Sequence, residues 1–130
     1  MVKWESKYET GIAAIDDQHK ELFRLVGELE RAIDYGEELD CSYLMARLDV
    51  YSLYHFTSEE HLMKKYGYPD IEKHIEEHKK FRIKILSMRE NCQATGSKEA
   101  RTELLLYLEN WLTTHTFDID QKYVPYLKRA

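Results

Sequence analysis

The chain has 130 residues, of which 43% are hydrophobic and 33% charged, and its net charge is -5. This composition suits one globular domain over residues 1–130, and the acidic balance disfavours nucleic acid, whose phosphates it would repel. The N-terminus lacks the apolar core of a signal peptide and no apolar stretch is long enough to cross a membrane, so we expect a cytoplasmic protein.

An N-terminal arm is expected up to about residue 15, with Trp4, Tyr8 and Ile12 spaced to pack against the rest of the chain. A first helix follows, because Asp16 or Asp17 can accept hydrogen bonds from its first free N–H groups. Its apolar residues recur at helical spacing and form one stripe: Leu22, Phe23, Val26, Leu29 and Ile33. Gly36 is expected to end this helix.

Three further helices follow the same periodicity. The second is predicted from about residue 42 to 66, with Gly67 and Pro69 after it, and the third from about 70 to 92. Ser97 is a plausible N-cap for the fourth, which carries Leu104, Leu108 and His115. A short tail closes the chain. No segment alternates with the period of a strand, so we predict an all-α, antiparallel up-down-up-down four-helix bundle with an N-terminal arm and a short C-terminal tail.

Cys41 and Cys92 stand far apart and show neither CxxC spacing nor the density of a disulfide framework. They could pair with each other. We expect them instead to be free thiols in a reducing compartment.

Five histidines and two carboxylates fall at positions that predict a metal site: His19, His55, Glu59, His74, His78, His115 and Asp120. His55 and Glu59 are four residues apart, as are His74 and His78, so each pair points to one side of its helix. In an antiparallel bundle, the start of the first and third helices is level with the end of the second and fourth. All seven side chains therefore reach one height in the core.

Asp120 follows His115 by five residues, which on a regular helix turns its direction by about 140°. Both side chains can face the site only if the helix ends or widens into a π-type turn between them.

The donor count favours two ions over one. Histidine with carboxylate suits a borderline metal such as iron. Two six-coordinate ions have twelve positions, of which five histidine nitrogens, two bridging carboxylates and one bridging oxide or hydroxide fill eleven. One position would stay open for a small diatomic ligand.

The chain resembles the hemerythrin family, most closely its short bacterial members, almost from end to end. The resemblance rests on GIAAIDDQHKELF, YHFTSEEHLM, HIEEHKKF and WLTTHTFDIDQKY. It implies two iron ions with an oxo or hydroxo bridge. His74, His78 and His115 would complete one iron, and His19 and His55 would hold the iron with the open position. Glu59 and Asp120 would bridge the two ions, and O₂ would bind reversibly for storage, delivery or scavenging.

Other interpretations fit less of the chain. HIEEH matches an inverted zinc-protease motif with Glu77 as base, but one zinc would leave four ligands unused. A ferritin-like oxidase needs Glu-x-x-His, and no Glu here has a His three residues later. With the same irons, a sensor for O₂, NO or iron, or a peroxidase or NO-reducing enzyme, stays open as an alternative function.

Two expectations concern the surroundings of the site. His61 is six residues after His55, points away from it, and is expected at the surface. Aromatic and aliphatic side chains within about a turn of the ligands should line a dry pocket: Phe23, Tyr51, Phe81, Trp111 and Ile119.

Overall fold

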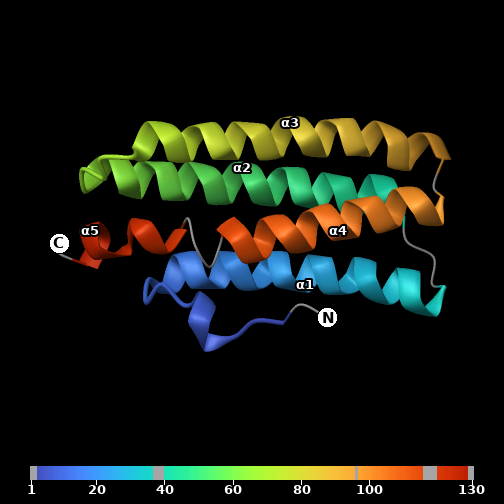
Figure 1. The fold of residues 1–130 in the computed structure, drawn as a ribbon, viewed down its shortest axis with the longest axis horizontal. Helices are drawn as coiled ribbons and strands as arrows, with labels where there is room; N and C mark the ends of the chain where they lie inside the picture. Colours follow the sequence, from blue (N-terminus) through green and yellow to red (C-terminus); the bar gives the residue numbers. More distant parts are fainter. Residues whose placement is uncertain (1–2, 37–39, 96, 116–119, 129–130) are drawn as a thin grey trace.

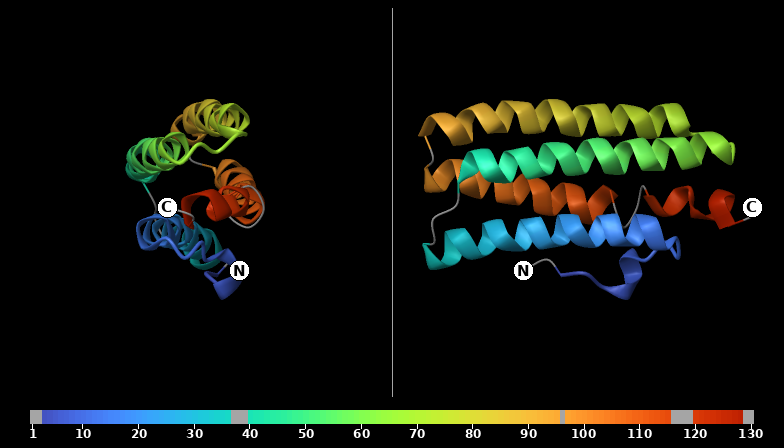
Figure 2. Two further views of the ribbon diagram at one scale, coloured as in Figure 1. Left: turned by 90° about the vertical axis from the view of Figure 1, so that its left-hand side faces the viewer. Right: turned by 180° about the vertical axis from the view of Figure 1, so that it is seen from behind.

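The computed structural model describes residues 3–36, 40–95, 97–115 and 120–128. Their helices are η1 (Ser6–Tyr8), α1 (Ala13–Tyr35), α2 (Cys41–Lys65), α3 (Ile71–Thr95), α4 (Lys98–Thr114), η3 (Asp120–Lys122) and α5 (Val124–Lys128). The described residues contain no strand, and the four long helices run antiparallel to their neighbours in chain order (Figures 1 and 2). The predicted all-α, up-down-up-down bundle is confirmed. Within these ranges, no helix is both long and apolar enough to span a bilayer.

The helix ends follow local chemistry. Gly36 ends α1 in a left-handed conformation, with φ of 65°, which an L side chain rarely adopts. Asp40 caps α2 by accepting a hydrogen bond from Ser42 N, and Ser97 caps α4 by accepting one from Ala100 N. The predictions for Gly36 and Ser97 are confirmed.

The predicted cap of the first helix is wrong. The helix begins earlier, at Ala13, so Asp16 lies in its first turn. Its carboxylate accepts hydrogen bonds from the N–H and hydroxyl of Thr10, both at 2.8 Å, and from Gly11 N at 3.2 Å. Asp16 therefore fixes the arm that leads into α1 rather than the first free amides of the helix.

The apolar core has two parts. The larger one fills most of the bundle and includes Leu22 on α1 and Tyr51 on α2. The smaller one lies toward the other end and includes Ile15 on α1 and Met63 on α2. The predicted ligand positions fall between these two parts along both helices, so apolar packing closes the site from both sides.

The N-terminal arm and the C-terminal tail both contribute buried side chains to the core. Tyr8 is buried in the larger core, against which Trp4 packs, as the spacing of the arm predicts. Tyr123 and Leu127, from the C-terminal tail, are buried in the smaller core. Gln121 joins the two segments by donating from Nε2 to the carbonyl oxygens of Tyr8 and Glu9, both at 3.2 Å.

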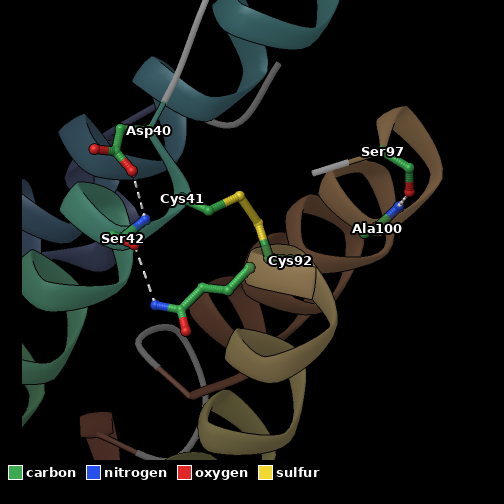
Figure 3. The surroundings of a disulfide bond; sticks show 7 residues. Asp40, Cys41, Ser42, Cys92, Ser97 and Ala100 are labelled. Atoms are coloured by element: carbon green, nitrogen blue, oxygen red, sulfur yellow. Dashed lines mark hydrogen bonds between the residues drawn. A yellow bond between two sulfur atoms is a disulfide. The ribbon is translucent and has the colours of Figure 1, made fainter. Parts of the chain in front are cut away.

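The expectation of free thiols is wrong, because Cys41 and Cys92 form a disulfide (Figure 3). Cys41 opens α2 and Cys92 lies in the last turn of α3, and each of these two antiparallel helices has 25 residues. Their Cα atoms therefore lie level, 6.0 Å apart, which is within the normal range for a disulfide. The argument for a reducing compartment loses its support, and the cytoplasmic location stays a prediction.

Candidate metal centre

The structure brings all seven predicted ligands into one cluster in the core. α1 contributes His19, α2 contributes His55 and Glu59, and α3 contributes His74 and His78. His115 lies directly after α4, and Asp120 is the first residue of η3. The regular α-helix ends at Thr114, and His115 follows it in a π-helical turn, so the widening that the spacing of His115 and Asp120 allows begins at His115.

The seven side chains form two overlapping groups. In one, Glu59 and Asp120 lie with His74, His78 and His115, and in the other the same two carboxylates lie with His19 and His55. Within each group the potential donor atoms are all within 4.8 Å of one another. Two metal positions that share both carboxylates would account for this overlap.

Asp120 lies between the two groups and contacts histidines of both. Its Oδ2 is 2.9 Å from His19 Nε2. Its Oδ1 is 2.8 Å from His115 Nε2 and 3.0 Å from His74 Nε2. The two oxygens of one carboxylate thus point to different sets of histidines, as a bridging ligand requires.

Glu59 also faces histidines of both groups, although one of its oxygens faces both of them. Its Oε1 contacts His55 Nε2, one turn before it on α2, and lies 3.9 Å from His78 Nε2. Its Oε2 is 3.7 Å from His74 Nε2. Glu59, on α2, therefore also lies between the two groups.

These donors are buried and have no ordinary hydrogen-bond partner. The side chains of all seven are at most 3% exposed. The Nε2 atoms of all five histidines and both oxygens of each carboxylate face one another rather than ordinary hydrogen-bond partners. Burying so many unsatisfied polar atoms is costly unless a cation joins them. The donor set and its burial therefore fit a pair of borderline divalent or trivalent metal ions.

The electrostatics of the cluster keep both carboxylates ionised. Burial raises the pKa of Asp120, but the adjacent histidines, chiefly His115, outweigh it and hold the pKa well below its ordinary value. Burial and the charge of Asp120 raise the pKa of Glu59, yet His55 brings that pKa below its ordinary value. Ionised carboxylates are the form that binds a metal.

The histidines differ from one another. Burial lowers the pKa of His19 and of His74, but the Asp120 carboxylate beside each outweighs burial and raises both pKa values. Burial lowers the pKa of His78 to about 3, because the neighbouring negative charges do not offset it. Without metal, protons on His19 and His74 would thus balance the carboxylates, and metal binding would displace them.

Aromatic rings pack against most of the histidines. Tyr51 stacks on His55 with ring centroids 5.4 Å apart, and Trp111 stacks on His115 at 4.2 Å. Phe81 packs on Trp111 at 4.2 Å, one layer farther out, and Phe23 packs on Trp4 at 5.4 Å. The predicted aromatic surroundings are therefore present in two layers, whereas Ile119 lies outside the described residues.

Three residues near the site were not anticipated. Phe56 stacks on His78 with ring centroids 3.9 Å apart. Gln18 Oε1 lies 2.5 Å from His55 Nδ1, where it can accept that N–H and leave Nε2 free for a metal. Tyr123 is fully buried, with its ring 5.6 Å from His74. Phe56 and Gln18 could have been found from the sequence, because each lies next to a predicted ligand, His55 or His19. No pattern in the sequence of the tail indicates that Tyr123 reaches the site.

Two residues outside the cluster bear on the alternatives. His61 is exposed, as predicted. Glu77, the base required by the zinc-protease motif, is not among the grouped residues and instead lies 3.7 Å from Lys80 Nζ. The HIEEH motif therefore contributes its two histidines and not its glutamate.

Comparison with known proteins agrees with this geometry. The family described as the hemerythrin HHE cation binding domain matches residues 10–127. The chain belongs to the hemerythrin family. A bacteriohemerythrin from Methylococcus capsulatus is 29% identical over 98% of this chain and 97% of its own length. One from Pseudomonas aeruginosa is 30% identical over 98% of this chain and 82% of its own.

A solved hemerythrin structure has the same fold as this chain. A crystal structure of wild-type hemerythrin matches with a TM-score of 0.76 and 28% sequence identity, over 98% of both chains. A hemerythrin-like protein from Naegleria gruberi is 29% identical over 92% of this chain and 88% of its own length. The bundle is therefore a hemerythrin fold with a potential histidine and carboxylate metal site.

Proposed function

We propose that this hemerythrin holds two iron ions and binds O₂ reversibly. The observation that carries the proposal is that Glu59 and Asp120 belong to both groups of donors. One ion would be held by His74, His78 and His115, and the other by His19 and His55, with both carboxylates shared. When bound, a ferrous pair supplies the electrons with which O₂ is held reversibly.

The two groups are unequal, which supports binding of a ligand at one of them. One group offers three histidines and the other offers two, in addition to the shared carboxylates. The open position would therefore lie on the side of His19 and His55. Gln18 and Tyr51 flank His55 on that side and orient its ring by a hydrogen bond and by stacking.

The residues around the site favour reversible O₂ binding over an enzymatic reaction at the irons. Apolar packing encloses the donors on both sides along α1 and α2, and the ligand side chains are at most 3% exposed. Excluding water slows loss of the bound ligand and oxidation of the irons. The grouped carboxylates, Glu59 and Asp120, are both used as shared ligands, so neither is left as an independent base.

The test is cyclic exposure of the reduced protein to O₂ and argon while visible absorption is recorded. The proposal predicts a band that appears with O₂ and disappears with argon over repeated cycles. His61→Ala should behave like the wild type, because this histidine is exposed. A single irreversible change on the first exposure would contradict carriage and would favour the sensor or the enzyme.

A further inference from the structure

The outer side of α2 carries a row of exposed apolar side chains, which we call the α2 face. It consists of Tyr43, Val50, Leu53 and Tyr54, whose exposures are 54%, 70%, 54% and 65%. The opposite side of the same helix is buried in the bundle core. In the end-on view of Figure 2, α2 occupies a corner of the bundle, and the exposure of the four side chains places them on its outer side. A contiguous apolar surface of this kind usually marks an interaction site.

The α2 face is hollowed on both sides of its central residues. A hollow of about 510 Å³ lies toward α1 and is lined in part by Leu25, Tyr43 and Val50. A second, of about 610 Å³, is lined in part by Leu53, Thr57 and His61. Val50 and Tyr54 line both hollows. The surface thus presents two projecting side chains between two recesses, which suits side chains from a facing helix.

Charged groups beside the α2 face already have partners within the chain. Arg47 lies 2.8 Å from a Glu21 oxygen and 3.4 Å from a Glu28 oxygen, on the side of α1. Arg82 of α3 lies 3.1 Å from an Asp49 oxygen on the other side. A helix covering the face would therefore bury apolar side chains without separating these charges from their partners.

The two ends of the face carry opposite charge. Asp40 is exposed at the N-terminal end of α2, whereas Lys64 and Lys65 are exposed at the C-terminal end. If a second α2 lies antiparallel across the first, with the twofold axis near residue 52, Asp40 of one copy is level with Lys64 of the other. The same register sets Val50 opposite Tyr54 and Tyr43 opposite His61. The face is thus complementary to itself, as a twofold interface requires.

We propose that the α2 face is an interface between two copies of this chain, packed as antiparallel α2 helices. Tyr54 of each copy enters a hollow beside Val50 of the other. The helix dipoles favour the same orientation, since the positive end of each α2 lies beside the negative end of its partner. The metal clusters lie on the inner side of α2, so this interface leaves them closed.

Sedimentation velocity of the iron-loaded full chain over a concentration series tests the interface. The wild type should form a dimer, and Val50→Glu should raise its dissociation constant by at least about tenfold. Tyr54→Lys is a second variant, and both sites are at least 65% exposed, so the fold should tolerate them. Ile83→Glu is the matched control, because Ile83 is equally exposed, at 68%, but lies on α3.

The orientation has its own measurement. A mixture of Val50→Cys and Tyr54→Cys proteins should form a mixed disulfide faster than either variant links to itself. A wild type that stays monomeric at every concentration would overturn the proposal. The partner of the α2 face would then be a protein other than a second copy of this chain. A dimer that Val50→Glu does not weaken, or one in which the two variants link no faster than each alone, would overturn it too.

Discussion

His19 and Asp120 come from opposite ends of the chain and meet in the core, with Nε2 of the histidine 2.9 Å from Oδ2 of the carboxylate. α4 ends at Thr114, ahead of His115, and Asp120 begins the separate helix η3. Since Oδ1 of the same carboxylate lies 2.8 Å from His115 Nε2, one side chain joins the two groups of donors.

We expect Asp120→Ala and Glu59→Ala to remove more iron than His19→Ala. Each carboxylate belongs to both groups, so its loss would open a position on each ion, whereas His19 belongs to one group. Iron content after identical loading measures the difference, and His61→Ala is the surface control. Near-full and equal occupancy in Glu59→Ala and His19→Ala would argue against shared carboxylates.

Gln18→Leu should weaken iron binding by about 10- to 100-fold, because it removes the acceptor that orients a ligand. Gln18 Oε1 lies 2.5 Å from His55 Nδ1 in the structure. Gln18→Glu keeps an acceptor there and should retain most of the affinity. The measurement is competition for iron with a chelator of known affinity. Unchanged affinity in Gln18→Leu would show that His55 needs no such support.

Without metal, the protein should lose stability as the pH falls from about 6.5, partly because of His78. Burial lowers the pKa of His78 to about 3 in the folded state, below the ordinary value of 6.5. Between these values the unfolded chain binds a proton that the folded chain does not, so acid favours unfolding by about 1.4 kcal/mol per pH unit. His19 and His74, whose pKa values are raised, act in the opposite sense: their contribution is lost as the pH rises.

His78→Gln isolates this contribution. Urea unfolding of the metal-free variant should depend less steeply on pH between about 6 and 4.5 than unfolding of the wild type. His61→Gln should leave the slope unchanged, since His61 is exposed. If the slopes of wild type and His78→Gln coincide, His78 takes up its proton in the folded state as readily as in the unfolded chain.

The helices and their inner faces were predictable because periodicity is local. Leu48, Glu59 and Met63 of α2 share one side by spacing alone, and all are buried. The antiparallel topology predicts that the ligand positions on the four helices lie at the same height along the bundle. These two inferences were enough to bring the seven candidate ligands to one place.

The remaining features depend on contacts that spacing does not specify. The pairing of Cys41 with Cys92 depends on the matched lengths of α2 and α3, which were predicted only to within a few residues. The burial of Tyr123 depends on the packing of the C-terminal tail against Ile15 and Met63, which the spacing of the tail does not specify. Asp16 resembled an N-cap by residue type, and only the position of Thr10 shows its other role.

The disulfide should stabilise the bundle by about 4 kcal/mol in a non-reducing buffer, since it closes a long loop in the unfolded chain. The two cysteines are 51 residues apart. A double variant, Cys41→Ala with Cys92→Ala, should unfold at lower denaturant and ignore reductant, whereas reductant should destabilise the wild type. Equal unfolding of oxidised and reduced wild type would show that the bond adds no stability.

The central claim is that the chain holds two iron ions between shared carboxylates. Elemental analysis of protein expressed with ample iron tests it most directly. Five histidines and two carboxylates exceed what one ion can use. We therefore predict about two irons per chain and little zinc. One metal per chain under the same conditions would contradict the account.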